Sequence, residues 1–265
     1  MSLRKLCGRF GFVCIISVIC IILCINANAE NCYRWYCKRT SDHTQPSIDK
    51  NMEWISEYKG VYLDKEHATQ DQDKVIYLTF DAGYENGNVE NILDILHEQQ
   101  VPGAFFILGN LIKRNPDLVK RMVDEGHLVC NHTYTHKNIT TLSATEIKSE
   151  LIKLEEAYSS ITGKQMDKYF RPPEGTFDRG SLQAVSDAGY KTVFWSFAYA
   201  DWDNNKQMTA ADAKKKIMDN VHNGEIMLLH PTSATNACIL RDIICDLKFM
   251  GYRFGTLDEL NFDAS

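Results

Sequence analysis

From residue 74 onward, short apolar segments rich in β-forming residues alternate with longer segments of helical periodicity. The apolar segments include residues 75–80 (VIYLTF) and 225–229 (EIMLL), whereas residues 88–100 carry apolar side chains every three or four positions. Alternation of strand and helix is typical of βαβ units, in which helices cover a sheet of parallel strands. Six or seven such units in one run predict an α/β fold with a parallel (β/α) barrel.

Residues that start and stop helices mark the predicted helices. Pro116 suits the first turn of a helix and Gly126 its C-cap, and residues 143–146 (SATE) form a capping box. Cys238 and Cys245 are seven apart on the last helical pattern and are predicted to face the core. The helices are predicted at residues 88–100, 115–125, 143–160, 178–188, 209–221 and 234–250, and a final strand at 252–254.

The first 29 residues have the layout of a secretory signal peptide. Arg4, Lys5 and Arg9 precede an apolar stretch over residues 11–25, and residues 27–29 (ANA) offer a cleavage site. An uncleaved membrane anchor is the alternative, because the stretch is just short of a typical membrane span. We therefore expect export across the cytoplasmic membrane, with membrane attachment only through this segment if it stays uncleaved.

The remaining chain is acidic and poor in cysteine. Loss of residues 1–29 removes three positive and no negative charges, so the net charge moves from −6 to −9. Such a surface disfavours nucleic acid as a partner. Five cysteines remain, and an odd number argues against a complete disulfide framework. Whether Cys32 pairs with Cys37 is left open.

Residues 30–73 differ in character from the regular pattern that follows. They contain turn formers, charges and aromatic residues, and we predict an irregular N-terminal extension lying on a main domain of residues 74–265. Its expected anchors on the main domain are Trp35, Tyr36, Tyr58 and Tyr62.

Polar residues follow five of the predicted strands. In α/β barrels the carboxyl ends of all strands open on one face, where catalytic groups gather. We therefore predict a single active site assembled from distant parts of the chain, comprising Asp81, His132 with His136, Arg171, Asp201 and His230.

Each of these residues suggests a particular role in hydrolysis. His132 and His136 are four apart, which places both imidazoles on one face of a helical turn, and imidazole suits a metal such as zinc. A carboxylate beside a metal, here Asp81, can act as a base on water whose pKa the metal lowers, although a simple capping role is the alternative.

The remaining candidates are an arginine, an acid and a histidine. In residues 171–175 (RPPEG), two prolines fix the backbone, so the guanidinium of Arg171 can grip a carboxylate. His230 is a general acid if a carboxylate raises its pKa. Asp201 and Trp202 suit either a sugar-binding cleft or a barrel rim.

The five segments resemble the motifs of the polysaccharide deacetylases, carbohydrate esterases with a distorted (β/α) barrel also called the NodB homology domain. The resemblance covers about residues 74–260 and rests on residues 79–83 (TFDAG), 132–136 (HTYTH), 171–175, 201–202 (DW) and 228–230 (LLH). It implies that Asp81 is the catalytic base and that His132 and His136 bind a divalent metal ion, zinc being expected. It also implies that Arg171 orients the base, and that Asp201 tunes His230, which protonates the leaving amine.

Within the family, residues 80–87 (FDAGYENG) are most similar to the δ-lactam-biosynthetic de-N-acetylases of spore cortex peptidoglycan. Residues 35–39 (WYCKR) and 43–46 (HTQP) resemble the N-terminal extension of that subgroup. The implied substrate is N-acetylmuramic acid in peptide-stripped glycan strands of the cell wall or spore cortex, leading to muramic δ-lactam. We expect a monomer whose substrate contacts come from Trp202, Tyr84, Glu85 and Pro173.

One position departs from the family pattern. Most members have a second, metal-binding aspartate after the base and the δ-lactam subgroup usually has asparagine, whereas this chain has Ala82. A methyl group cannot bind a metal, so weaker metal binding is expected. Two other functions remain open: deacetylation of N-acetylglucosamine in peptidoglycan or chitin-like oligomers, and a barrel that binds glycan without cleaving it.

Overall fold

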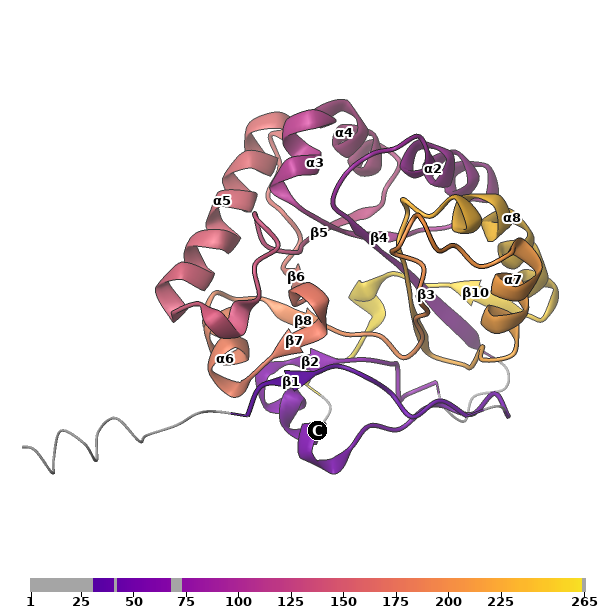
Figure 1. Cartoon of the computed structure of the whole chain (residues 1–265), viewed down its shortest axis with the longest axis horizontal. Coiled ribbons are helices and arrows are strands. Elements are labelled where there is room, and N and C mark those ends of the chain that lie inside the picture. The colour runs from indigo at the N-terminus through magenta and orange to yellow at the C-terminus, as the bar shows by residue number, and fades with distance from the viewer. Residues whose placement is uncertain (1–30, 41, 68–72, 264–265) are drawn as a thin grey trace, which may run out of the picture. The chain divides into compact units, whose positions relative to one another are not determined.

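A curled parallel sheet with helices packed on its outer face forms the body of the protein (Figure 1). The computed structural model describes residues 31–40, 42–67 and 73–263, so the predicted signal segment lies outside the described residues. The strands of this sheet are β2 (Gly60–Val61), β3 (Lys74–Ala82), β4 (Ala104–Ile107), β5 (Leu128–Asn131), β6 (Tyr169–Phe170), β8 (Lys191–Val193), β9 (Glu225–Leu229) and β10 (Tyr252–Phe254).

The strand order is β10-β3-β4-β5-β6-β8-β2. β9 lies off this path and pairs with β3. Every pairing in this sheet is parallel. A single bridge between Phe197 and Met227 links the chain after β8 to β9, so the sheet curls round with little pairing at that point. The predicted α/β fold with a distorted barrel is thereby confirmed.

The helices on the outer face agree with the sequence pattern to within one or two residues at most ends. Ser143 and Glu146 form the predicted capping box at the start of the longest helix. The short helix over Gly109–Arg114, which follows β4, was not predicted. The helices are α2 (Asn88–Gln99), α3 (Gly109–Arg114), α4 (Pro116–Asp124), α5 (Ala144–Thr162), α6 (Arg179–Asp187), α7 (Ala210–Met218) and α8 (Ala234–Phe249). In the part of the chain that is described, no helix is long and apolar enough to cross a membrane.

The prediction that the two cysteines of α8 face the core was wrong. Cys238 and Cys245 are solvent-exposed rather than core-facing, because the apolar stripe of Ile239, Ile243 and Leu247 takes the buried face. Their seven-residue spacing does put both on one side of the helix, but on the side turned away from that stripe.

Alternation along β3 divides the interior into two layers. Ile76, Leu78 and Phe80 pack toward the helices, whereas Val75 and Tyr77 join a cluster inside the curl of the sheet. Successive side chains of a strand point to opposite faces. The inner row therefore continues with Thr79 and Asp81 at the carboxyl end of the strand, where the predicted site lies.

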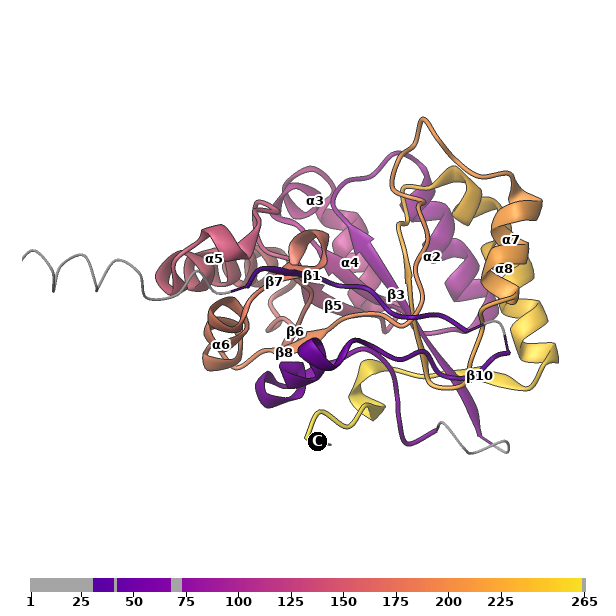
Figure 2. The same ribbon diagram turned by 60° about the horizontal axis from the view of Figure 1, so that its bottom comes forward.

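The N-terminal extension, predicted as irregular, contains short regular elements. β1 (Tyr33–Arg34) pairs antiparallel with β7 (Thr176–Phe177), and β2 adds a parallel strand beside β8. In the chain, the 3₁₀ helix η1 (Lys50–Tyr58) lies between β1 and β2. Figure 2 shows this indigo segment running alongside β7 and β8.

Aromatic packing joins the extension to the main domain. Of the four expected anchors, Trp35 is buried, and Tyr58 and Tyr62 pack partly buried against the same cluster, which includes Phe177 and Phe194. Tyr36 is exposed instead, and its hydroxyl donates to Asp49 within the extension. Three of the four residues thus hold the extension in place.

Candidate active site

Arg171 and Asp81 form an ion pair at the carboxyl end of the sheet. Arg171 follows β6, and its side chain is fully buried. Its Nη1 donates to Asp81 Oδ1 at 2.9 Å, and its Nη2 donates to Thr79 Oγ1 at 2.9 Å. Because the guanidinium also donates to two backbone carbonyls, those of Val193 and Phe194, it is held in one orientation.

The charges around Asp81 keep its carboxyl group ionised. Burial alone would raise the pKa of this group, but the positive charge of Arg171, with a smaller contribution from protonated His230, lowers it below its usual value. Asp81 is therefore a carboxylate at neutral pH, the form that a general base requires.

His132 and His136 come together in a loop, not on a helical turn as the spacing predicted. Thr133 and His136 have left-handed backbone conformations, with φ of 69° and 59°. Side chains hold this geometry: Asn131 Oδ1 accepts from the amide of Thr133, and Thr133 Oγ1 accepts from the amide of His136, both at 2.9 Å. The two imidazole rings nevertheless lie close, with centroids 4.9 Å apart.

The chemistry of this pair suits a divalent metal ion. Nδ1 of His132 lies 2.8 Å from the carbonyl oxygen of Arg171, a contact that fixes the ring and leaves Nε2 as the free ligand atom. Burial lowers the pKa of His132 to about 4, so the imidazole is neutral and can bind a metal. Its Nε2 lies 3.6 Å from Asp81 Oδ2.

In the described part of the chain, two candidate protein ligands lie at this place, His132 and His136. Ala82 is buried in the apolar layer between sheet and helices and offers no donor atom. Among the residues that the structure describes, no group of three or more histidine, cysteine, aspartate or glutamate side chains could hold a metal ion. His132 and His136 therefore fit a metal, but as two ligands of the three that catalytic zinc sites usually have.

A second pair, His230 and Asp201, lies on the same edge. Nδ1 of His230 lies 2.7 Å from Asp201 Oδ1, and the His230 amide donates to Oδ2 at 2.8 Å. Burial alone would lower the pKa of His230, but the hydrogen bond and the charge of Asp201 raise it above its usual value. The imidazole thus keeps its proton at a pH where a free histidine would lose it.

Sequence reasoning missed a third member of this group, Asn236. It is buried, and its Nδ2 donates to Asp201 Oδ2 at 2.6 Å and to the carbonyl of His230 at 3.1 Å. Tyr199 donates its hydroxyl to the amide oxygen, which fixes the orientation of the group. Asn236 lies in the first turn of α8, where the sequence gives no sign that it faces a catalytic pair.

The four residues predicted to bind substrate have different surroundings. Trp202 is 60% exposed beside His230, with ring centroids 6.2 Å apart, and Tyr84 is also exposed. The Tyr84 hydroxyl accepts from Asn204, which links two loops on this edge. Glu85 folds back onto the amide of Gly87, and Pro173 is buried, so its ring offers little surface to a ligand.

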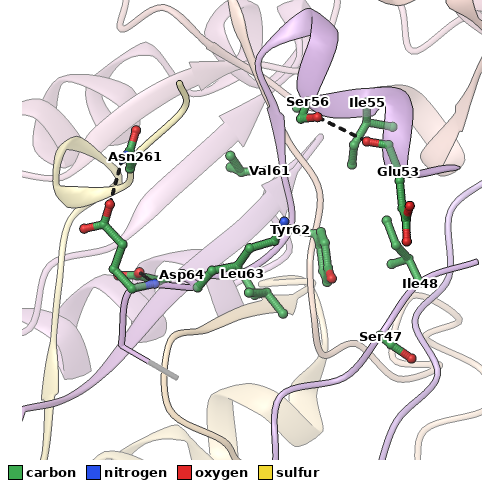
Figure 3. Close-up of a pocket in the computed structure, with 13 residues that line it drawn as sticks. Ser47, Ile48, Glu53, Ile55, Ser56, Val61, Tyr62, Leu63, Asp64 and Asn261 are labelled. Carbon is green, nitrogen blue, oxygen red and sulfur yellow. Dashed lines mark hydrogen bonds between the residues drawn. The ribbon is translucent and has the colours of Figure 1, made fainter. Parts of the chain in front are cut away.

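A separate cavity of about 290 Å³ lies between the extension and the C-terminal segment (Figure 3). Its lining includes Tyr62, Asp64 and Asn261, and Asn261 donates to Glu66 at its edge. None of the predicted site residues lines this cavity, so it is distinct from the candidate active site.

Comparison with known proteins agrees with the motifs. The family model for polysaccharide deacetylase matches residues 68–193. The chain is 42% identical over 230 residues to the peptidoglycan-N-acetylmuramic acid deacetylase PdaA of Bacillus subtilis, covering 86% of each protein.

Two solved structures extend the agreement to three dimensions. That of B. subtilis PdaA, a family 4 carbohydrate esterase, has a TM-score of 0.81 and 41% identity, covering 87% of this chain and 97% of the other. A family 4 carbohydrate esterase from Bacillus anthracis has a TM-score of 0.72 and 35% identity, covering 88% and 98%. Family members generally depend on a divalent metal ion. The chain therefore belongs to the polysaccharide deacetylase family, whose members are hydrolases that act on amide bonds.

Proposed function

We propose that this protein removes the acetyl group from N-acetylmuramic acid in peptide-stripped peptidoglycan and so leads to muramic δ-lactam. The observation that supports this most is the presence of an ionised carboxylate and a protonated imidazole on one edge of the sheet, each held by its own partner. Similarity to B. subtilis PdaA over 86% of the chain supports the choice of muramic acid as the sugar.

The chain's own residues divide the acid and base work. Asp81 takes a proton from the attacking water, and Arg171 keeps that carboxylate oriented and ionised. His230 gives its proton to the nitrogen that leaves the acetyl carbon, so the freed group departs as a neutral amine. Asp201 keeps His230 protonated for this step.

His132 and His136 are the residues that we propose to hold the metal, with zinc as the expected ion because neutral imidazole suits it. When bound, the metal polarises the acetamide carbonyl and lowers the pKa of the water. Asp81 Oδ2 lies 3.6 Å from His132 Nε2, and this proximity to a proposed metal ligand supports Asp81 as the base.

The amine produced by deacetylation is adjacent to the lactyl group of muramic acid. If the lactyl carboxyl carries no peptide, the amine closes onto it with loss of water and forms the lactam. The proposed place of action is outside the cytoplasmic membrane, in the cell wall or spore cortex, reached through the signal segment of residues 1–29.

The test is mass spectrometry of glycan strands after incubation with the protein. Peptide-stripped and peptide-bearing muramic strands are treated in parallel, and oligomers of N-acetylglucosamine serve as the comparison sugar. We expect loss of acetyl followed by loss of water on stripped strands alone. Acetyl loss from the glucosamine oligomers and not from muramic acid would contradict the proposed substrate. No change on any glycan would favour a barrel that binds without cleaving.

A further inference from the structure

The backbone after β8 is bonded on two sides. Arg171 donates to the carbonyls of Val193 (2.9 Å) and Phe194 (3.1 Å). The next carbonyl, that of Trp195, accepts from the N-terminal extension: Trp35 Nε1 donates at 2.8 Å and Cys37 Sγ at 3.2 Å. The carbonyls of Val193 and Phe194, which orient Arg171, are therefore followed directly along the chain by the carbonyl of Trp195, which is hydrogen-bonded to the extension.

The side chains repeat this connection. The Arg171 guanidinium carbon lies 4.1 Å from the ring centroid of Phe106 and 5.7 Å from that of Trp195, within the range of a cation–π contact. Trp35 stacks on Phe194 with centroids 4.2 Å apart. The buried guanidinium of Arg171 thus lies against Trp195, and the neighbouring Phe194 stacks on Trp35 of the extension.

The extension also holds the loop that follows Arg171. The amide of Trp35 donates to the carbonyl of Gly175 at 2.8 Å. A Cβ on Gly175 would come within 2.7 Å of the Trp195 ring and 3.1 Å of the Trp35 Cβ, so glycine is needed for this close approach. Trp35 thus fixes both segments between which the arginine side chain is held.

We propose that Trp35, with Cys37, is a positioning residue of the active site, acting through the carbonyl of Trp195 on Arg171 and so on Asp81. This inference rests on the proposed roles of Arg171 and Asp81. A displacement of about 1 Å in a group far from the chemistry can cost about 10²-fold in rate. The N-terminal extension is then part of the catalytic scaffold and not only a cover on the barrel.

A second tryptophan of the extension provides a matched control. Trp54 packs in the same aromatic cluster, but its Nε1 donates to the carbonyl of Asn51 within η1. Trp35→Phe and Trp54→Phe each keep an aromatic ring and each remove one indole N–H. Only the first removes a donor to the backbone that continues from the acceptors of Arg171.

The experiment measures acetate release from stripped muramic strands by the whole chain with saturating metal. We expect Trp35→Phe to lower kcat about tenfold or more with KM unchanged, a further loss in Trp35→Phe/Cys37→Ala, and no change in Trp54→Phe. A wild-type kcat in Trp35→Phe, or an equal loss in both single variants, would overturn the proposal.

A second measurement separates this inference from the proposed function. The Arg171 Nε–H signal in a ¹H–¹⁵N NMR spectrum reports the hydrogen bond to Val193 whether or not the protein cleaves the glycan. We expect this signal to shift in Trp35→Phe and to keep its position in Trp54→Phe. If wild type released no acetate, the proposed function would fail, and an unshifted signal in Trp35→Phe would still refute the positioning role.

Discussion

At the scale of single residues, the two catalytic candidates have environments that push their pKa values apart. Burial is offset at Asp81 by the positive charge of Arg171, and at His230 by the negative charge of Asp201. The carboxyl group is therefore ionised and the imidazole protonated over the same pH range. Such a separation is how one site performs acid and base chemistry together.

Replacing Asp201 with asparagine tests the source of the proton. The pKa of His230 is raised in the wild-type protein, so the active, protonated form persists above the ordinary histidine pKa of about 6.5 and is lost as pH rises further. In Asp201→Asn this support is gone, and the alkaline limb of the kcat–pH profile should move to lower pH. An unmoved alkaline limb would show that His230 is not the group that titrates.

Asn236 is expected to matter for the stability of the folded protein. In Asn236→Ala, one oxygen of the buried Asp201 carboxylate loses a donor, and the Tyr199 hydroxyl loses its acceptor. Removing a partner from a buried polar group costs about 1–3 kcal/mol, so urea denaturation should show a loss of that order. Exposed Asn205, changed to alanine, is the control, and an equal effect in both variants would argue against the role of Asn236.

At the scale of elements, the loop that carries the two metal-binding candidates depends on a helix behind it. Glu150 of α5 is buried, and its Oε2 accepts from the amide of Thr135 at 2.8 Å and from its hydroxyl at 2.9 Å. Since Thr135 lies directly before His136, α5 helps to set the position of that imidazole.

Glu150→Ala should therefore weaken metal binding. The amide of Thr135 loses its acceptor and the loop gains freedom, and loss of such an outer partner typically costs about 10–100-fold in metal affinity. Titration calorimetry with Zn²⁺ measures this directly. The exposed Glu156 on the same helix, changed to alanine, should bind Zn²⁺ as the wild type does. Unchanged affinity in Glu150→Ala would contradict the supporting role.

The elements also show how far the sequence could predict this site. Asp81, Arg171 and His230 were predicted to lie together because each follows a predicted strand, and the carboxyl ends of parallel strands share one edge of the sheet. The spacing of His132 and His136 suggested a helical turn and was wrong in geometry. Their loop is set by bonds from Asn131 and Thr133 to the backbone, and residue spacing carries no information about such bonds.

Residues that act from behind the site were the hardest to foresee. Trp35 lies far from the motifs in sequence, and Asn236, although only six residues after His230, reaches Asp201 only in the folded chain. Periodicity located the helix that holds Asn236, but not the direction of its side chain. The apolar stripe of α8 likewise decided that the two cysteines face solvent, which their spacing alone did not indicate.

At the scale of the whole molecule, we propose that the protein holds its metal ion with fewer protein ligands than usual. Two imidazoles and no third ligand at Ala82 predict a weakly held ion. Activity should fall on treatment with a chelator and return on addition of Zn²⁺. Metal content measured by atomic emission, before and after dialysis, follows the same loss. Full activity in protein whose metal content is near zero would refute metal dependence.

The assignment of Asp81 as the catalytic base is tested by the Asp81→Asn variant on peptide-stripped muramic strands. Released acetate and glycan binding are measured for wild type and variant in the same preparation. We expect the variant to lose about 10²–10⁴-fold in rate, because the amide cannot accept a proton, while glycan binding is nearly unchanged. Acetate release by Asp81→Asn at the wild-type rate would contradict the assignment of Asp81 as the base.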